Sequence, residues 1–351
     1  MGRQKAAADE ARITIRDIAA RAGVSVATVS RVLSSSHPVS DDLRTRVMDV
    51  VRELDYVPNA HARSLAGAGP KTVAILIDSI TGAAFAHVAR GIEEEASARD
   101  WLSLVCVTGG DPERELALVN LMRQQGAAAV VLLGGTYDLA DYQLRMARFA
   151  KSLDSAGSRL VLCGRPPLQG DVPATTIEYD NANGAFTMTS HLLSMGHRRV
   201  LILPGPENFT TAQARLEGYR NALTTYGLPY DAGLVRHGRY EDGVAHRIVL
   251  DALRGKNDFT AVFAGTDVVA TGVMEGLREA GLSVPDDISV VGFDDIPLAR
   301  HLSPGLTTVH VPYEEMGRMA LRLVSSPRRD KDHVVLGTHV VVRQSVRPLA
   351  V

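Results

Sequence analysis

The chain has 351 residues, of which 45% are hydrophobic and 22% charged, a balance typical of a globular protein with two or three packed units. No uncharged apolar run is long enough to span a bilayer, and residues 1–12 lead into no apolar segment of the secretory kind. We therefore expect a cytoplasmic protein. The formal net charge is −2, but basic residues outnumber acidic ones by 10 to 8 in residues 1–69 and are outnumbered by 28 to 32 in the rest. Only the N-terminal part is basic, as expected if it alone contacts phosphate groups, but an excess of this size does not establish such a partner by itself.

The cysteines and histidines give no sign of a metal site. Cys106 and Cys163 lie in separate apolar runs and form no CxxC pair, so we expect two buried thiols without a disulfide. The eleven histidines show no spacing typical of metal ligands. We expect neither a metal nor a cofactor.

Residues 14–33 predict two short helices joined by a tight turn. Thr14 can cap the first helix, with Asp17 completing a capping box. Gly23 stands where a helix ends in the left-handed conformation, and Ser25 can cap the second helix. Apolar residues at helical spacing form the inner faces: Ile15, Ile18, Ala19, Ala22, Val29, Val32 and Leu33. Val26, Ala27, Ser30 and Arg31 then point outward.

Two more helices are expected before the main body of the chain. One runs from Asp41 to about Asp55, with Ser40 as its cap and an inner stripe of Leu43, Val47, Val50, Val51 and Leu54. The next spans about two turns between Asn59 and Gly67. A helix this short is marginal in water and should form only when something packs against it. A plain linker helix, with Leu65 in a core contact, is the alternative. The Gly-rich stretch that follows lacks the spacing of a phosphate loop, so we interpret it as a linker.

Three stretches resemble the lactose-repressor (LacI/GalR) family of bacterial transcription regulators. They are D-I-A-x-x-A-G-V-S-x-x-T-V-S-R-V-L at 17–33, V-S-x-x-x-R-x-x-V at 39–47 and L-D-Y-V-P-N-A-H-A-R-S-L-A at 54–66. The likeness continues to Arg343 and Ser345. It implies a small all-α helix-turn-helix headpiece, followed by a hinge helix that becomes ordered on operator DNA. In a helix-turn-helix of this kind, the second helix lies in the major groove of the DNA.

The resemblance assigns DNA contacts to single residues. Arg31 is expected to read a base, because arginine on guanine is the commonest specific contact. Val26 and Ala27 occupy the family's specificity positions, and Leu65 matches its wedge leucine, which opens a base step in the minor groove. The remaining DNA-binding candidates are Thr14, Ser25, Thr28 and Ser30 for phosphates, with Asn59 and Ala62 in the hinge helix.

From Thr72 onward, short apolar runs alternate with amphipathic segments. The alternation predicts two doubly wound lobes of parallel sheet, covered by helices on both faces. The family resemblance agrees, since its core looks like a periplasmic binding protein whose chain crosses between lobes three times. The expected strands are 72–77, 102–107, 128–133, 159–164, 200–205, 234–237, 261–265 and 289–294. The expected helices are 85–99, 112–125, 139–156, 183–195, 211–226, 243–254 and 267–280.

These elements define the predicted domains. The headpiece comprises 1–58, and the hinge helix with its linker 59–70. The N-lobe comprises 71–178 with 313–332, and the C-lobe 179–312 with 333–351. We expect the crossings near 178–181, 308–313 and 332–336.

A ligand site is expected between the lobes, where polar residues follow the apolar strands. The resemblance matches Arg215 and Asp294 to the family's ligand-binding arginine and aspartate, and Tyr179 to a stacking aromatic. Tyr240, Thr266 and Asp78 are further candidates, for which structural roles are equally reasonable. Asp267 and Asp295 are interpreted as structural, because an aspartate at such a position commonly caps a helix. Carboxylates bind hydroxyl groups and arginines donate to ring oxygens, which suits a sugar or sugar derivative as the effector.

These observations favour a sequence-specific transcriptional regulator, in this family most often a repressor, over two alternatives. An enzyme is disfavoured because the chain lacks a nucleophile elbow, a phosphate loop, an HExxH motif and a dinucleotide fingerprint. A periplasmic transport-binding protein would fit the core alone but not the headpiece. The expected partners are double-stranded operator DNA, a small effector and a second copy of the chain. No leucine heptad follows Ser345, so we expect a dimer and not a tetramer.

Overall fold

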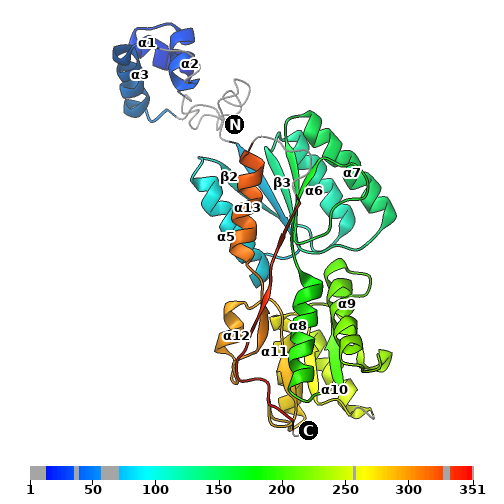
Figure 1. Cartoon of the computed structure of the whole chain (residues 1–351). Coiled ribbons are helices and arrows are strands. Elements are labelled where there is room, and N and C mark those ends of the chain that lie inside the picture. The colour runs from blue at the N-terminus through cyan, green and yellow to red at the C-terminus, as the bar shows by residue number, and fades with distance from the viewer. Residues whose placement is uncertain (1–12, 35–38, 57–70, 256–257, 327–332, 350–351) are drawn as a thin grey trace, which may run out of the picture. The chain divides into compact units, whose positions relative to one another are not determined.

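A computed structural model describes residues 13–34, 39–56, 71–255, 258–326 and 333–349 (Figure 1). They belong to two compact units, one ending at Lys71 and one beginning at Thr72, each described by itself below. Within the described ranges, no helix combines the length and the apolar character needed to cross a membrane.

Residues 13–34 and 39–56 of the first unit form three helices around a small apolar core. They are α1 (Ile15–Ala22), α2 (Val26–Ser34) and α3 (Asp41–Glu53). The predicted inner faces are confirmed except at Leu43, which is half-buried outside the core. The buried core consists of Ile18, Ala19, Ala22, Val29, Val32, Val47 and Val50, with Ile15, Leu33, Val51 and Leu54 partly buried against it. An ion pair between Arg21 and Glu53 joins α1 to α3 on the surface.

The predicted ends of these helices are largely confirmed. The Asp17 carboxylate accepts hydrogen bonds from the backbone N–H of Thr14 at 2.8 Å and from its hydroxyl at 2.7 Å. Gly23 ends α1 with a φ of 65°, and Ser25 Oγ accepts the N–H of Thr28 at 3.1 Å. Ser40 precedes α3 as expected, but its side chain makes no capping bond.

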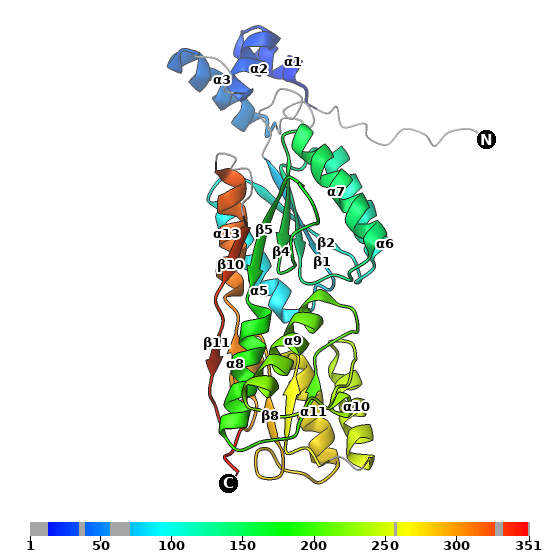
Figure 2. The same cartoon turned by 45° about the vertical axis from the view of Figure 1, so that its right-hand side comes forward.

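The N-lobe of the second unit is a six-stranded parallel sheet in the order β10-β5-β4-β3-β1-β2. Alternate residues of β1 enter two separate apolar clusters, Val73 with one and Ala74 with the other, so both faces of the sheet are covered. Helices α5 and α13 pack on one face and α6 and α7 on the other (Figure 2). The strands are β1 (Thr72–Ile77), β2 (Leu102–Val107), β3 (Ala129–Leu133), β4 (Arg159–Cys163), β5 (Ala174–Tyr179) and β10 (His333–Leu336). The helices are α5 (Ala83–Ser97), α6 (Pro112–Gln124), α7 (Ala140–Ser155) and α13 (Tyr313–Ser325).

The C-lobe is built on a parallel three-stranded sheet in the order β6-β7-β8, with β9 and β11 forming an antiparallel pair. Helix α8 packs against α9, and α10 against α11. The strands are β6 (Val200–Leu203), β7 (Ala261–Ala264), β8 (Ser289–Val291), β9 (Thr308–His310) and β11 (His339–Val341). The helices are α8 (Asn181–Ser194), α9 (Thr210–Thr225), α10 (Asp242–Arg254), α11 (Asp267–Glu279), α12 (Pro297–His301) and the short 3₁₀ turn η1 (Ala232–Leu234).

The structure contradicts one predicted strand and the lobe assignment of two segments. The strand predicted at 234–237 is replaced by η1 and a single bridge between Val235 and Ile202, because the Asp231 carboxylate accepts the N–H of Gly233 at 2.8 Å and turns the chain. The segment 333–336 was assigned to the C-lobe, but it forms β10, which pairs with β5 at the edge of the N-lobe sheet. Tyr179 likewise ends a strand of the N-lobe.

Three short segments carry the chain between the lobes. They are 179–181 between β5 and α8, 310–313 between β9 and α13, and 336–339 between β10 and β11. The lobes also meet at a pair of loops. There the N–H of Thr210 donates to the carbonyl of Thr136 at 2.9 Å, and the ring of Tyr137 lies edge-on to Phe209.

Candidate functional sites

Helix α2 presents a small polar and apolar surface to solvent. Val26, Ala27, Ser30 and Arg31 are all exposed, as the helical periodicity predicted. Thr28 is half-buried, and its hydroxyl lies 2.9 Å from that of Ser25. The hydroxyl of Thr14 is engaged by Asp17, whose pKa is lowered by the two bonds from Thr14. A short helix with small exposed side chains and one arginine can approach base edges closely.

The hinge candidates Asn59, Ala62 and Leu65 lie outside the described residues. Their assignment to the minor groove stays a prediction from the sequence.

The second candidate site is centred on Arg215, in the second turn of α9. Its guanidinium is buried and donates three hydrogen bonds: Nε to the Asn181 side chain at 2.9 Å, one terminal nitrogen to the carbonyl of Gly265, and the other to the Tyr179 hydroxyl at 3.1 Å. The guanidinium carbon, Cζ, also lies over the ring of Phe293, 3.9 Å from the ring centre. The strand-end residue Tyr179 comes from the N-lobe, so Arg215 links the two lobes.

The carboxylate of Asp294 lies beside Arg215 without being bonded to it. The closest approach of the two charged groups is 3.7 Å, longer than a hydrogen bond. Asp294 is bonded instead to Tyr313, at the start of α13. The Tyr313 hydroxyl donates to Asp294 Oδ1 at 2.7 Å. Burial raises the pKa of Asp294 to about 6, against the opposing effects of Arg215 and Tyr313. A buried carboxylate with one strong donor retains acceptor capacity for a hydroxyl group.

Aromatic rings surround this pair of charges. Tyr179 lies edge-on to Tyr313, with the ring centres 5.7 Å apart, and is tilted against Phe293. Tyr240 lies 5.9 Å from the Arg215 guanidinium, and its hydroxyl donates to the carbonyl of Pro204 at 3.1 Å. Four of the six predicted effector residues, Tyr179, Arg215, Tyr240 and Asp294, thus belong to one cluster. Their role toward a ligand stays a prediction.

The other two predicted effector residues are placed differently. Thr266 is the N-cap of α11, where its hydroxyl accepts the N–H of Val269 at 3.1 Å, so part of its bonding capacity is already used. Asp78 follows β1, and the charges that act on its carboxylate come from Arg239 and Glu241 rather than from Arg215.

Asp267 and Asp295 form internal bonds, as expected for structural residues. The fully buried Asp267 accepts the hydroxyl of Thr308 at 2.5 Å and the N–H of Ile296 at 2.9 Å. Asp295 pairs with Arg343 at 2.6 Å and with His310 at 3.0 Å. The expected capping role belongs instead to Thr266.

Three members of the cluster were not predicted from the sequence as effector residues: Asn181, Phe293 and Tyr313. Phe293 directly precedes Asp294 at the end of a predicted strand, and Asn181 lies two residues after Tyr179. The closeness of Asn181 and Phe293 in the sequence to predicted effector residues could therefore have indicated that they belong to the site. Tyr313 lies at the predicted crossing into the N-lobe, and only the folded chain brings its hydroxyl to Asp294.

Comparison with known proteins covers both units. The model described as "Bacterial regulatory proteins, lacI family" matches residues 14–59, and that of a periplasmic binding protein-like domain matches 189–346. The ribose operon repressor of Haemophilus influenzae is 33% identical over 343 residues, covering 96% of this chain and 99% of the relative.

Two solved structures are similar along nearly the whole chain. One is a complex of the transcriptional regulator CelR with cellobiose, with a TM-score of 0.68 and 30% identity over 95% of this chain and 100% of that one. The other is the Lac repressor bound to ONPG, with a TM-score of 0.80 and 25% identity over 95% and 99%. The ribose operon repressor and CelR are named as a repressor and as a transcriptional regulator. With its headpiece, its two-lobed core and a relative matched from end to end, the chain belongs to the lacI family of bacterial regulatory proteins.

Proposed function

We propose that this protein is a transcriptional repressor that binds a pseudo-palindromic operator as a dimer and is switched by a small carbohydrate. The proposal is carried by the cluster at the lobe boundary. There a buried arginine and a carboxylate with spare acceptor capacity lie among aromatic rings drawn from both lobes. Hydroxyl groups suit the carboxylate and the guanidinium, and the apolar face of a sugar ring suits the aromatic side chains.

Relatives support a carbohydrate as the effector class. The names of two of them refer to a ribose operon and to cellobiose. We propose no catalytic activity and no cofactor for this chain. Because its proposed target is chromosomal DNA, we place it in the cytoplasm.

The edge strand β2 supports dimerisation. Leu102, Leu104 and Val105 are between 41% and 58% exposed on this strand, which ends one side of the N-lobe sheet. An apolar edge strand favours association unless it is covered. We infer that a second copy of the chain covers this strand, because a two-fold symmetric operator requires a dimer.

DNA binding can be tested by selecting sites from a random-sequence duplex pool with the full-length protein. We expect a two-fold symmetric site for the wild type. Arg31→Ala should bind that site more weakly and lose its preference at one base pair per half-site, at a cost of about 1–3 kcal/mol per contact. An unchanged base preference would contradict the role of Arg31, and the absence of any enriched site would contradict sequence-specific binding.

The effector can be sought with a thermal-shift screen of sugars, sugar phosphates and nucleobases. A ligand that binds only the folded protein raises its stability with concentration. We expect a neutral sugar to give the largest shift. A nucleobase or a phosphorylated compound in that place would contradict the proposed effector class.

A further inference from the structure

Helices α5 and α13 approach so closely that their backbones touch. A Cβ atom built on Gly91 would lie 2.0 Å from the carbonyl oxygen of Glu314, and one built on Gly317 would lie 2.1 Å from that of Val88. No side chain fits at either position, so the contact has no soft layer that could absorb a displacement. The two helices therefore move as one body, here called the α5–α13 pair.

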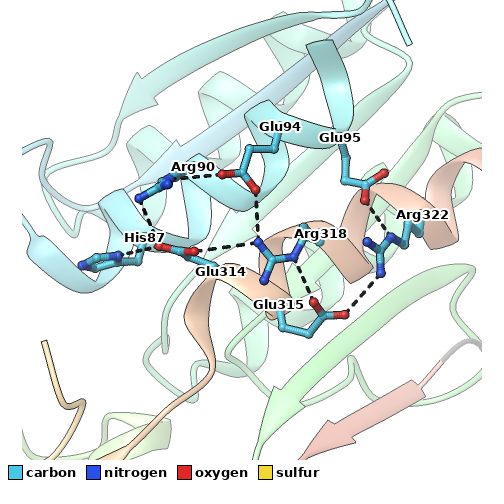
Figure 3. A network of polar contacts seen from close by, with 8 residues as sticks. All are labelled: His87, Arg90, Glu94, Glu95, Glu314, Glu315, Arg318 and Arg322. Carbon is cyan, nitrogen blue, oxygen red and sulfur yellow. Dashed lines mark hydrogen bonds and ion pairs between the residues drawn. The ribbon is translucent and has the colours of Figure 1, made fainter. Parts of the chain in front are cut away.

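A chain of alternating charges fixes the register of this pair (Figure 3). Arg318 and Arg322 on α13 reach Glu94 and Glu95 on α5, at 3.1 and 2.7 Å. At the start of α13, Glu314 lies 3.2 Å from His87 on α5. Each exposed pair contributes little stability on its own, but together they resist sliding of one helix along the other.

Tyr313 and Glu314 connect this charge network to the effector cluster. They are consecutive residues at the first turn of α13, yet their side chains belong to different systems. The Tyr313 hydroxyl donates to Asp294 in the C-lobe, whereas Glu314 contacts His87 in the N-lobe. A cavity of about 420 Å³ borders both residues and leaves the end of the helix room to shift.

We propose that Tyr313 is the positioning residue that couples effector binding at Asp294 to the α5–α13 pair, an inference that rests on the proposed function. A sugar hydroxyl that donates to Asp294 shares the negative charge of the carboxylate with the Tyr313 hydroxyl and so weakens the Tyr313 bond. The strength of the Tyr313 bond then differs between the free and the bound protein. Only such a difference between states allows a ligand to shift a conformational equilibrium. Because α13 is locked to α5, the change at Tyr313 reaches both helices.

The first test needs no ligand. In Tyr313→Phe the ring still packs on Tyr179, but the hydroxyl that reaches Asp294 is removed. Hydrogen–deuterium exchange of the full-length protein should become roughly threefold to tenfold faster along both α13 and α5, the factor that corresponds to the net loss of one ordinary hydrogen bond. The matched control is Tyr226→Phe, which removes an exposed hydroxyl bonded to the Ser190 carbonyl and should leave α5 unchanged. Faster exchange confined to the first turn of α13 would overturn the proposal, since a local structural role predicts that result.

The second test uses the sugar that gives the largest shift in the thermal screen. Because Tyr313 belongs to the effector cluster, the affinity of Tyr313→Phe for that sugar is measured first, and operator binding is then compared with no sugar and with enough sugar to saturate the variant. The sugar should no longer change operator affinity in this variant. A full operator response would overturn the role of Tyr313. If no sugar binds the wild type, the proposed effector class fails, while the exchange experiment still decides whether Tyr313 is linked to α5.

Discussion

Among the described residues of the second unit, two arginines are buried next to a carboxylate, and they differ in how many of their hydrogen bonds go to that carboxylate. Arg165 in the N-lobe forms a bidentate pair with Glu115, at 2.9 and 3.2 Å, and also donates to Tyr142. Arg215 stays 3.7 Å from Asp294 and donates to neutral groups instead. Burial of an arginine therefore does not by itself indicate a ligand site. A carboxylate left with spare bonding capacity does.

The comparison predicts that Arg165 matters most for stability. Arg165→Met would leave the Glu115 carboxylate buried without its cation, and the free energy of unfolding should fall by about 3–5 kcal/mol. Urea denaturation measures this loss. The double variant Arg165→Met with Glu115→Leu should recover most of it, because the unpaired charge is then removed. A single-variant loss below about 1 kcal/mol would show that the pair is not structurally important.

Arg215 should matter more for the ligand than for the fold. In Arg215→Met the Asp294 carboxyl keeps its bond from Tyr313 and can take up a proton, so we expect a stability loss of about 1–3 kcal/mol. The thermal shift with the effector should disappear, while operator affinity without effector is retained. The matched control is Arg220→Met on the same helix, where the arginine is exposed and stacks on Tyr230. A normal effector shift in Arg215→Met would remove this residue from the site.

The pKa of Asp294 gives the effector response a pH dependence. With a pKa of about 6, the carboxylate that accepts sugar hydroxyls is mostly protonated at pH 5. Effector affinity should therefore fall about tenfold between pH 7 and pH 5. The effect on stability has the opposite direction. Folding raises the pKa of Asp294 above its ordinary value of 3.8. The stabilising contribution of Asp294 to folding is therefore complete below pH 3.8 and is lost as the pH rises through about 6.

Both effects can be checked with Asp294→Asn. Titration calorimetry over this pH range should show an affinity that no longer varies with pH, with weaker binding throughout. The difference in unfolding free energy between wild type and variant should change between pH 4 and pH 7. If the effector affinity of the wild type does not change between pH 5 and pH 7, the raised pKa of Asp294 has no role in binding.

The smallest effect is expected at an exposed pair with equally good geometry. Arg145 lies 2.6 Å from Glu113 on the surface of the N-lobe, yet solvent screens both charges. Arg145→Gln should change the free energy of unfolding by less than about 0.5 kcal/mol in urea denaturation. A loss comparable to that of Arg165→Met would mean that distance, and not burial, determines the contribution of such pairs.

The parts of the fold that followed from the sequence are those encoded locally. Continuous apolar runs predicted β1 and β3, and the Thr14–Asp17 spacing predicted the start of α1, because each signal lies within one turn or one strand. Arg215 and Asp294 were accessible through the family resemblance.

The parts that did not follow depend on distant partners. β10 was assigned to the wrong lobe because a four-residue edge strand does not indicate which sheet will accept it. Glu115 and Arg165 are 50 residues apart, and nothing in either local pattern predicts their pairing. The Tyr313–Asp294 contact likewise arises only when the chain crosses between the lobes for the second time.

The late position of β10 and β11 in the chain also has a consequence for biosynthesis. The first unit is formed by a continuous segment, and a continuous domain can fold as soon as it leaves the ribosome. The N-lobe sheet, by contrast, lacks its edge strand until residue 336 has emerged, and the C-lobe lacks β11 until residue 341. Each nascent chain therefore carries a complete headpiece well before the core that controls it. Translation that stopped shortly after Lys71 would release the DNA-binding part without its switch.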